Sequence, residues 1–325
     1  MLDGLLRDDT HMIQLMSYYR MPGDTEEMVR QVTESVGLDG VEALIYGTEP
    51  AERPFRGVTK GVHLNYWPYW MDFYRGDAER LGEIFSGEAE ICRFYGGHTP
   101  DQWISNIRAN IRAALAERPL YLVWHVQECT PEEAWTWHFR YSDKEVLKTA
   151  AEVYRACADL IPDGVRVLFE NVFWPGLYRM EPENIDFFFH ELDDEEHTGL
   201  MFDTGHFMNT EPELASEADG AAAVCRMAER LGSLKTLIRG VHMSCSLSAA
   251  YRRGFVRKMP EHCTGEMLMK HISSIDQHRP FQTGAAKQIL DVLRPEILVH
   301  ELFNETFSAA ADKVWIQRRA AGFDA

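Results

Sequence analysis

The chain has 325 residues, of which 45% are apolar, so it can bury one large α/β core or two smaller ones. Its 33 basic and 51 acidic residues give a formal charge of -18, which repels phosphate backbones and anionic lipid. Nucleic acid is therefore a disfavoured partner, and no membrane association is expected.

The N-terminal stretch MLDGLLRDDTHM carries charges where a signal peptide needs an apolar core, and no later run approaches the roughly 20 apolar residues of a membrane span. Six cysteines are dispersed without a C-x-x-C pair, which indicates neither a zinc ribbon nor a disulfide framework. We expect a soluble, cytoplasmic protein with reduced thiols.

Short β-type runs alternate with longer helical patterns along the whole chain. Eight strands are predicted: Met12–Tyr19, Val41–Gly47, Gly61–Tyr66, Leu120–Val126, Val165–Val172, Gly199–Gly205, Gly240–Ser246 and Ile297–Phe303. Helices are predicted between the strands, for example after Ser142, from Pro182 onward, and over the segment ELASEADGAAAVCRMAERL.

Eight such β-then-α units predict a single (β/α)8 TIM barrel over residues 1–325, because no Pro/Gly/Ser-rich linker divides the chain. A doubly wound sheet is the main rival, but it would ordinarily bring a glycine-rich phosphate turn, and the sequence has none. Two long segments, Tyr66 to about Thr99 and Leu247–Phe281, follow strands 3 and 7, so we expect them over the barrel mouth.

The last six predicted strands each carry a His, Asp or Glu near the C-terminal end, in an apolar setting. These residues are His63, His125, Glu170, Asp203, His242 and Glu301. The C-terminal ends of barrel strands converge on one mouth, where unpartnered charges would cost several kcal/mol of desolvation. A divalent cation would compensate all of them, since His nitrogen and carboxylate oxygen suit Zn, Mn, Fe and Co.

Each residue also has a simpler interpretation. A lone His63 or His125 is more often a structural histidine, Glu170 or Glu301 could hold an arginine, and Asp203 could cap the helix after it. The recurrence of such residues at equivalent places, strand after strand, favours the metal site.

The motifs FENV, FDTGH, VHMS and HEL at the ends of strands 5 to 8 resemble the xylose isomerase-like barrel superfamily, which includes sugar-phosphate isomerases and epimerases and endonuclease IV-type enzymes. The resemblance covers most of the chain in layout, and D-T-G-H is its most specific motif. It implies a metal bound by Glu170, Asp203, His242 and Glu301.

Endonuclease IV-type members of the superfamily use two earlier histidines, here His63 and His125, and a third metal held by the His of D-T-G-H and a D-x-H motif. The matching residues are His206, Asp276 and His278. Met243, Ser244 and Cys245 replace the usual residues after His242, and some 33 residues separate His242 from Asp276. An Asp276 that caps a turn and an exposed His278 are the competing interpretation.

The resemblance implies one to three divalent ions (Zn, Mn, Co or Fe), and the reaction depends on their number. Four carboxylates bring a formal charge of -4, which three divalent ions turn to +2 and one ion turns to -2. We expect a divalent-metal-dependent isomerase or epimerase of a small sugar, sugar phosphate or sugar-like acid, which needs one ion and in which the catalytic pair Glu170 and Glu301 moves a proton. His206 would then bind a substrate hydroxyl.

With two or three ions, the alternative is a phosphoesterase related to endonuclease IV, with Glu170 shared between two metals. A barrel that keeps its metal but only binds a ligand is a third alternative. The acidic composition argues against DNA, so a small carbohydrate-like substrate is the expected partner.

We expect substrate contacts from Trp67 in the aromatic segment NYWPYWMDFY, from Trp174 in VFWPG, and from Arg252, which could grip an anionic tail. The aromatic segment could equally form a lid or a subunit interface, which leaves a homo-oligomer open. The nearer interpretation of Arg252 and its neighbouring arginines is a solvated surface.

Overall fold

The computed structural model describes residues 12–304 and 306–323, and most of the stretch MLDGLLRDDTHM that argued against a signal peptide lies outside these ranges. Eight parallel strands close into a barrel in the order β1 to β8, with β8 pairing back to β1. The strands are β1 (Ile13–Tyr18), β2 (Gly40–Ile45), β3 (Thr59–Leu64), β4 (Tyr121–His125), β5 (Arg166–Glu170), β6 (Thr198–Asp203), β7 (Ile238–Met243) and β8 (Ile297–His300). The predicted TIM barrel and its eight strands are confirmed.

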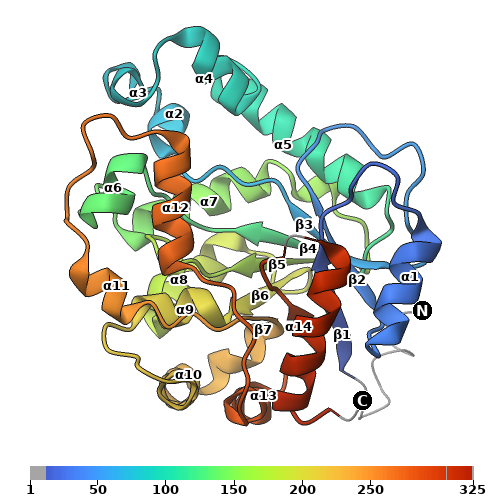
Figure 1. Ribbon diagram of the computed structural model, residues 1–325. Coiled ribbons are helices and arrows are strands. Elements are labelled where there is room, and N and C mark those ends of the chain that lie inside the picture. Colours follow the sequence, from blue (N-terminus) through green and yellow to red (C-terminus); the bar gives the residue numbers. More distant parts are fainter. Residues whose placement is uncertain (1–11, 305, 324–325) are drawn as a thin grey trace.

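Helices surround the barrel in the described ranges (Figure 1). They are α1 (Glu26–Ser35), α2 (Met71–Arg75), α3 (Ala78–Ile84), α4 (Glu88–Tyr95), α5 (Pro100–Leu115), α6 (Pro131–Thr136), α7 (Asp143–Arg155), α8 (Pro182–Leu192), α9 (Thr204–Thr210), α10 (Glu217–Leu231), α11 (Ala249–Gly254), α12 (Gly265–Ile275), α13 (Ala285–Leu293) and α14 (Phe307–Ala320). Short 3-10 helices cover η1 (Ala158–Leu160), η2 (Tyr178–Met180) and η3 (Gly232–Leu237).

The predicted helix starts at Ser142 and Pro182 agree with the structure, and a third start is displaced. Ser142 forms a capping box with Glu145, and Pro182 occupies the first turn of α8. The helix expected from ELASEADG onward starts only at Glu217, because Ser216 and Asp219 form a capping box there.

The connection between β2 and β3 differs from the predicted β-then-α repeat. Residues 46–58 contain no helix, although the two strands pair in parallel. Pro50, Pro54 and two glycines in this short segment disfavour a continuous helix.

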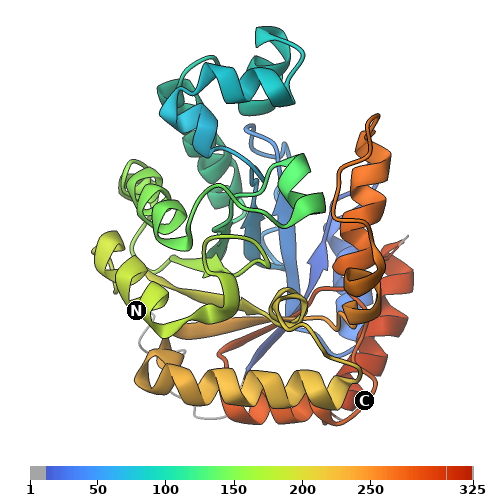
Figure 2. The same cartoon turned by 90° about the vertical axis from the view of Figure 1, so that its left-hand side faces the viewer.

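The long segments after β3 and β7 both extend beyond the same end of the barrel. Figures 1 and 2 show α2, α3 and α4 standing past this end, and in Figure 2 α12 (orange) rises on the other side of the mouth. Helix α12 also packs against α6. This is the end at which the strands finish, so the insertions surround the C-terminal mouth.

Apolar side chains fill the barrel interior below the mouth, so the polar strand ends rest on a packed floor. This interior layer consists of Leu15, Tyr121, Val123, Leu168, Met201, Ile297 and Val299. A separate, larger core joins the outside of the barrel to the helices. No helix in the described part of the chain is both long and apolar enough to cross a bilayer.

Candidate metal centre

The polar residues that end the strands meet at the mouth. Strand pairing sets His125 beside Glu170 and Asp203 beside His242. Each of these four side chains is at least nine-tenths shielded from solvent. The register therefore brings together residues that are far apart in the sequence.

All nine predicted metal ligands fall into three groups, and within each group the ligand atoms lie within 4.8 Å of one another. The groups are His63, His125 and Glu170; Glu170, Asp203, His242 and Glu301; and His206, Asp276 and His278. We call them the histidine group, the quartet and the outer group. Glu170 belongs to two of them.

Glu170 lies at the centre of the mouth, fully buried. Its Oε2 is 3.1 Å from His125 Nε2 and 3.3 Å from His63 Nε2, and its Oε1 is 3.2 Å from His206 Nδ1. Burial alone would raise the pKa of this carboxyl, but the imidazoles of His125 and His242 outweigh burial and hold it well below its usual range. Glu170 is therefore an anion surrounded by imidazoles.

Asp203 caps a helix with one carboxylate oxygen and leaves the other without a partner among the described residues, so the two interpretations from the sequence are compatible. Its Oδ1 accepts a hydrogen bond from the backbone N–H of His206 and so caps α9, whereas its Oδ2 is buried without a hydrogen-bond partner in the described part of the chain. Asn171 fixes the backbone here, because it accepts from Asp203 N–H and donates to Asp203 O. Burial raises the pKa of Asp203 to about 7.

The outer group includes the residues whose assignment the long insertion put in doubt. His278 Nε2 lies 2.7 Å from Asp276 Oδ2, and His206 Nε2 lies 3.3 Å from the same oxygen. Two backbone hydrogen bonds between Cys245 and Arg279, of 2.7 and 3.1 Å, close the insertion at its base. The D-x-H motif therefore lies beside the end of β7 despite the long intervening segment.

Four of the five histidines have one ring nitrogen tethered, which leaves the other for the group. The Nδ1–H groups of His63, His206 and His278 donate to the carbonyl oxygens of Leu64, Asn171 and Glu301. His242 is tethered through Nε2. Such tethers fix the tautomer of metal-ligating histidines. The Nδ1 of His125 has no partner among the described residues.

These residues fit divalent ions because several of their buried nitrogen and oxygen atoms lack well-aligned hydrogen-bond partners in the described structure. Both carboxylate oxygens of Glu170, Oδ2 of Asp203, Nδ1 of His242 and Oε2 of Glu301 are buried and make no well-aligned hydrogen bond in the described structure, although all but Asp203 Oδ2 lie 2.8 to 3.3 Å from an imidazole or carboxylate atom of the site. Buried polar atoms are normally paired, and here they gather at one place. Mixed imidazole and carboxylate ligands suit Zn, Mn, Fe or Co.

The three predicted substrate contacts lie around this centre at different depths. Trp174 is buried next to Phe173, whose ring centroid is 5.7 Å from that of His206. Trp67 is buried in the wall, where its Nε1–H donates to the carbonyl oxygen of Phe94. Its neighbour Tyr66 is the residue that faces the mouth.

Arg252 is buried behind the outer group and is not part of a solvated surface. Its Nε donates to Ser248 Oγ at 3.0 Å, Ser248 donates to Asn209 Oδ1 at 2.8 Å, and Asn209 donates to Asp276 Oδ1 at 3.3 Å. The guanidinium group is therefore connected to a candidate metal ligand through two side chains.

Three partly exposed tyrosines line the rim from the ends of β1 and β2 to the mouth. Tyr66 is 39% exposed, and the centroid of its ring lies 4.3 Å from that of His125. The ring centroid of Tyr46 lies 6.4 Å from that of Tyr66, and the ring centroid of Tyr19 lies 6.0 Å from that of Tyr46. Together they form a row of aromatic faces that ends at the candidate ligand His125, and we call it the tyrosine row.

Sequence reasoning missed Glu42. This carboxylate is fully buried on β2 and lies 3.0 Å from His242 Nε2. A single acid inside the apolar run VEALI was the available signal, but the residue is not at a strand end, where ligands were sought. With Glu42 included, three divalent ions would leave the site a formal charge of about +1.

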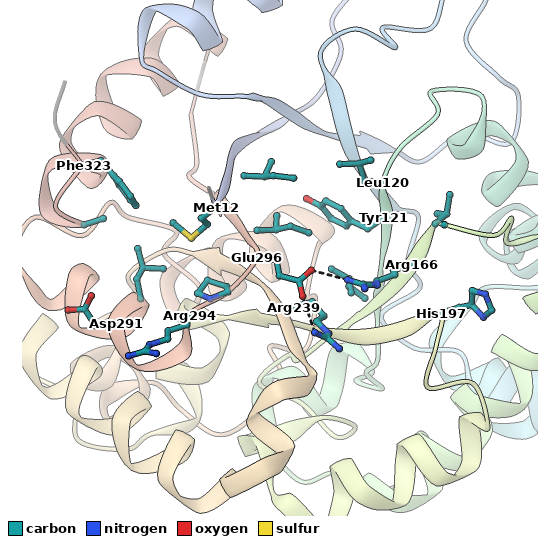
Figure 3. A pocket seen from close by; sticks show the side chains of 18 of the residues that line it. Met12, Leu120, Tyr121, Arg166, His197, Arg239, Asp291, Arg294, Glu296 and Phe323 are labelled. Atoms are coloured by element: carbon teal, nitrogen blue, oxygen red, sulfur yellow. Dashed lines mark hydrogen bonds and ion pairs between the residues drawn. The ribbon is translucent and has the colours of Figure 1, made fainter. Parts of the chain in front are cut away.

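A large cavity of about 1430 Å³ lies at the opposite end of the barrel (Figure 3). Its lining includes Leu120, Arg166 and Glu296, which precede or begin strands, and Glu296 forms ion pairs of 2.9 Å with Arg166 and Arg239. None of the nine candidate ligands lines it. Active sites of TIM barrels form at the other, C-terminal face.

No protein-family model and no curated protein matches the sequence. Solved structures do match it. Endonuclease IV from Thermus thermophilus superposes with a TM-score of 0.56 at 11% identity over 95% of this chain and 99% of that chain. An L-ribulose 3-epimerase gives 0.54 at 13% identity, over 96% and 94% of the two chains.

A D-tagatose 3-epimerase-like protein gives a TM-score of 0.52 at 15% identity, over 96% of this chain and 97% of that chain. Endonuclease and sugar epimerase folds are thus similarly close, so the superpositions do not separate the two reactions. The chain therefore shares the (β/α)8 barrel fold of these endonuclease IV and sugar 3-epimerase structures.

Proposed function

We propose that this protein is a metal-dependent phosphoesterase that hydrolyses a small organic phosphoester at the C-terminal mouth of its barrel. The observation that carries the proposal is the convergence of all nine candidate ligands into three groups, two of which share Glu170. A single-metal isomerase needs only the quartet, and the other two groups would then be buried titratable residues without a common purpose.

The histidine group, the quartet and the outer group would each hold one divalent ion. Bound ions would supply Lewis acidity toward phosphoryl oxygens and a water of lowered pKa. Glu170 would serve both the histidine group and the quartet, and the carbonyl tethers of His63, His206 and His278 would present neutral ring nitrogens. The net charge of about +1 at full loading would attract a phosphate, whereas one ion would leave the site negative.

The surroundings support a small organic substrate. The tyrosine row offers exposed aromatic faces for a sugar ring or another flat group next to the ligands. Phe173 and Trp174 cover the site from the β5 side and exclude water. The charge of -18 disfavours duplex DNA, which normally requires a basic footprint.

A sugar isomerase or epimerase is the second candidate, and one observation favours it. Glu170 and Glu301 both flank His242, with Glu301 Oε2 at 2.8 Å and Glu170 Oε2 at 3.3 Å from its Nδ1. Two carboxylates that share one ion can remove and return a proton at adjacent carbons. In this case the quartet alone would be loaded.

Metal analysis combined with turnover separates the candidates. The purified protein is loaded with Zn or Mn, desalted, and analysed for metal per chain. It is then assayed against bis(p-nitrophenyl) phosphate, sugar phosphates, free ketoses and a duplex with an abasic site. Two or three ions with phosphoester hydrolysis support the proposal. One ion with ketose epimerisation would establish the second candidate, and cleavage restricted to the duplex would refute the small substrate.

A further inference from the structure

We infer that Glu42 and Tyr121 are positioning residues for His242, which hold its ring so that Nδ1 faces the quartet. The inference rests on the proposed metal function, because the ring nitrogen that they expose is the one offered to the ion. Neither residue lies at the C-terminal end of its strand, and Tyr121 acts on His242 only through Glu42.

His242 is oriented in the opposite sense to the other three tethered histidines. His63, His206 and His278 donate Nδ1–H to backbone carbonyls and direct Nε2 toward their groups. His242 has Nδ1 inward, 2.8 Å from Glu301 Oε2, and its Nε2 donates to the Glu42 carboxylate at 3.0 to 3.2 Å. Among the four tethered histidines, His242 is therefore the one that is tethered by a side chain, and the other three are tethered by backbone carbonyls. A substitution can remove a side-chain tether.

A gap in the barrel interior allows the tether to form. Strand pairing sets Glu42 opposite Gly61 and Gly61 opposite Tyr121, so the three residues lie in one row across β2, β3 and β4. A Cβ on Gly61 would lie 2.2 Å from Tyr121 Cζ and 2.4 Å from its hydroxyl oxygen. The tyrosine ring therefore crosses over the glycine to reach Glu42.

The hydroxyl of Tyr121 donates to Glu42 Oε2 at 2.7 Å, and both residues are buried. A carboxylate in this apolar layer needs such donors, since burial without hydrogen bonds is costly. Tyr121 thus holds Glu42, and Glu42 holds His242 in the tautomer with the proton on Nε2. A carboxylate tether of this kind also makes the opposite nitrogen a more basic ligand.

Two substitutions separate the steps of this arrangement. Tyr121→Phe removes only the hydroxyl that orients Glu42, and Glu42→Gln keeps the shape of the side chain but removes its charge. Loss of an outer partner of a metal-bound histidine typically weakens metal affinity by about 10- to 100-fold. We expect a loss in this range for Glu42→Gln and a smaller loss for Tyr121→Phe, confined to one ion per chain.

Competition with a chromophoric chelator measures each zinc affinity, and long-range 1H–15N NMR of the zinc-loaded protein reports which nitrogen of His242 carries the proton. Met201→Leu is the matched control, because Met201 is an apolar residue buried in the same interior layer as Tyr121. The control should leave all zinc affinities and the His242 signals unchanged. Thermal unfolding of the metal-free variants shows whether each one is folded.

The outcomes distinguish this inference from the proposed function. If the wild type binds no divalent ion, the metal function itself fails. If the wild type binds ions and both folded variants bind them with unchanged affinity and His242 tautomer, the positioning role is refuted while the metal function stands. If both variants bind one of the ions with lower affinity and Met201→Leu binds all ions normally, the positioning role of Glu42 and Tyr121 is supported.

Discussion

The sharpest test of the site is Glu170→Gln, since Glu170 belongs to two of the three groups. The amide keeps the size of the side chain, but it replaces one acceptor oxygen by an NH2 that faces imidazole nitrogens 3.1 to 3.3 Å away. The histidine group and the quartet should both lose their ions, while the outer group keeps its own. Metal analysis should therefore find two fewer ions per chain, and phosphoester hydrolysis should be abolished.

The loss of two bound ions should also lower the stability that metal adds to the protein, and this effect can be calculated as a change in melting temperature. An ion at about 1,000 times its dissociation constant stabilises the folded state by about 4 kcal/mol. Unfolding of a 325-residue chain carries an entropy of about 0.7 kcal/mol/K, so each ion raises the melting temperature by about 6 °C. The rise in melting temperature on addition of metal should thus be about 12 °C smaller in Glu170→Gln than in the wild type.

Differential scanning calorimetry with and without Zn measures this difference, and Glu128→Gln is its control. Glu128 is also a buried carboxylate, but it accepts from the backbone N–H groups of Trp70 and Met71 and belongs to none of the three groups. Its substitution should lower both melting temperatures and leave the metal-induced rise intact. A Glu170→Gln protein with wild-type metal content and the same rise would refute the shared-ligand geometry.

Three further predictions address other parts of the molecule. Asp276→Asn should remove one ion and leave two, and unchanged metal content would eliminate the outer group. Tyr66→Ala should raise KM several-fold at unchanged metal content, and an unaltered KM would exclude the tyrosine row from substrate binding. Burial lowers the pKa of His271, which clasps α12 to Ala134 O, so the unfolded chain binds more protons than the folded one below about pH 6.5. Stability should therefore fall as pH drops through this range, hydrogen exchange in α12 should accelerate, and His271→Gln should flatten this dependence.

Much of the fold follows from short-range signals. The apolar runs that predict the strands are long enough to stand out, and capping residues such as Ser142 set helix starts locally. The helix missing between β2 and β3 was also visible in principle, because Pro50 and Pro54 disfavour it. The local sequence pattern does not predict the path of the insertion after β7, because this path depends on the contact between Cys245 and Arg279.

The candidate ligands were predictable because a barrel imposes one geometric rule on all strands. Parallel strands that close into a ring bring their C-terminal ends to one mouth, so each polar strand end is a candidate without knowledge of any distance. The rule does not say which side chain of a loop turns inward. The neighbours Tyr66 and Trp67 show this, since one faces the mouth and the other packs into the wall.

Glu42 marks the point at which sequence reasoning reaches its limit. Its role requires that Glu42, Gly61 and Tyr121 occupy one row across three strands, and register between strands is decided by the closed barrel rather than by any local motif. Each residue alone has an ordinary interpretation: an acid in a strand, a glycine before a histidine, a tyrosine at a strand start. Only their alignment explains why an apolar layer contains a carboxylate, and the same alignment connects that carboxylate to His242. Buried acids inside strands should therefore be sought as partners of strand-end histidines in other closed barrels.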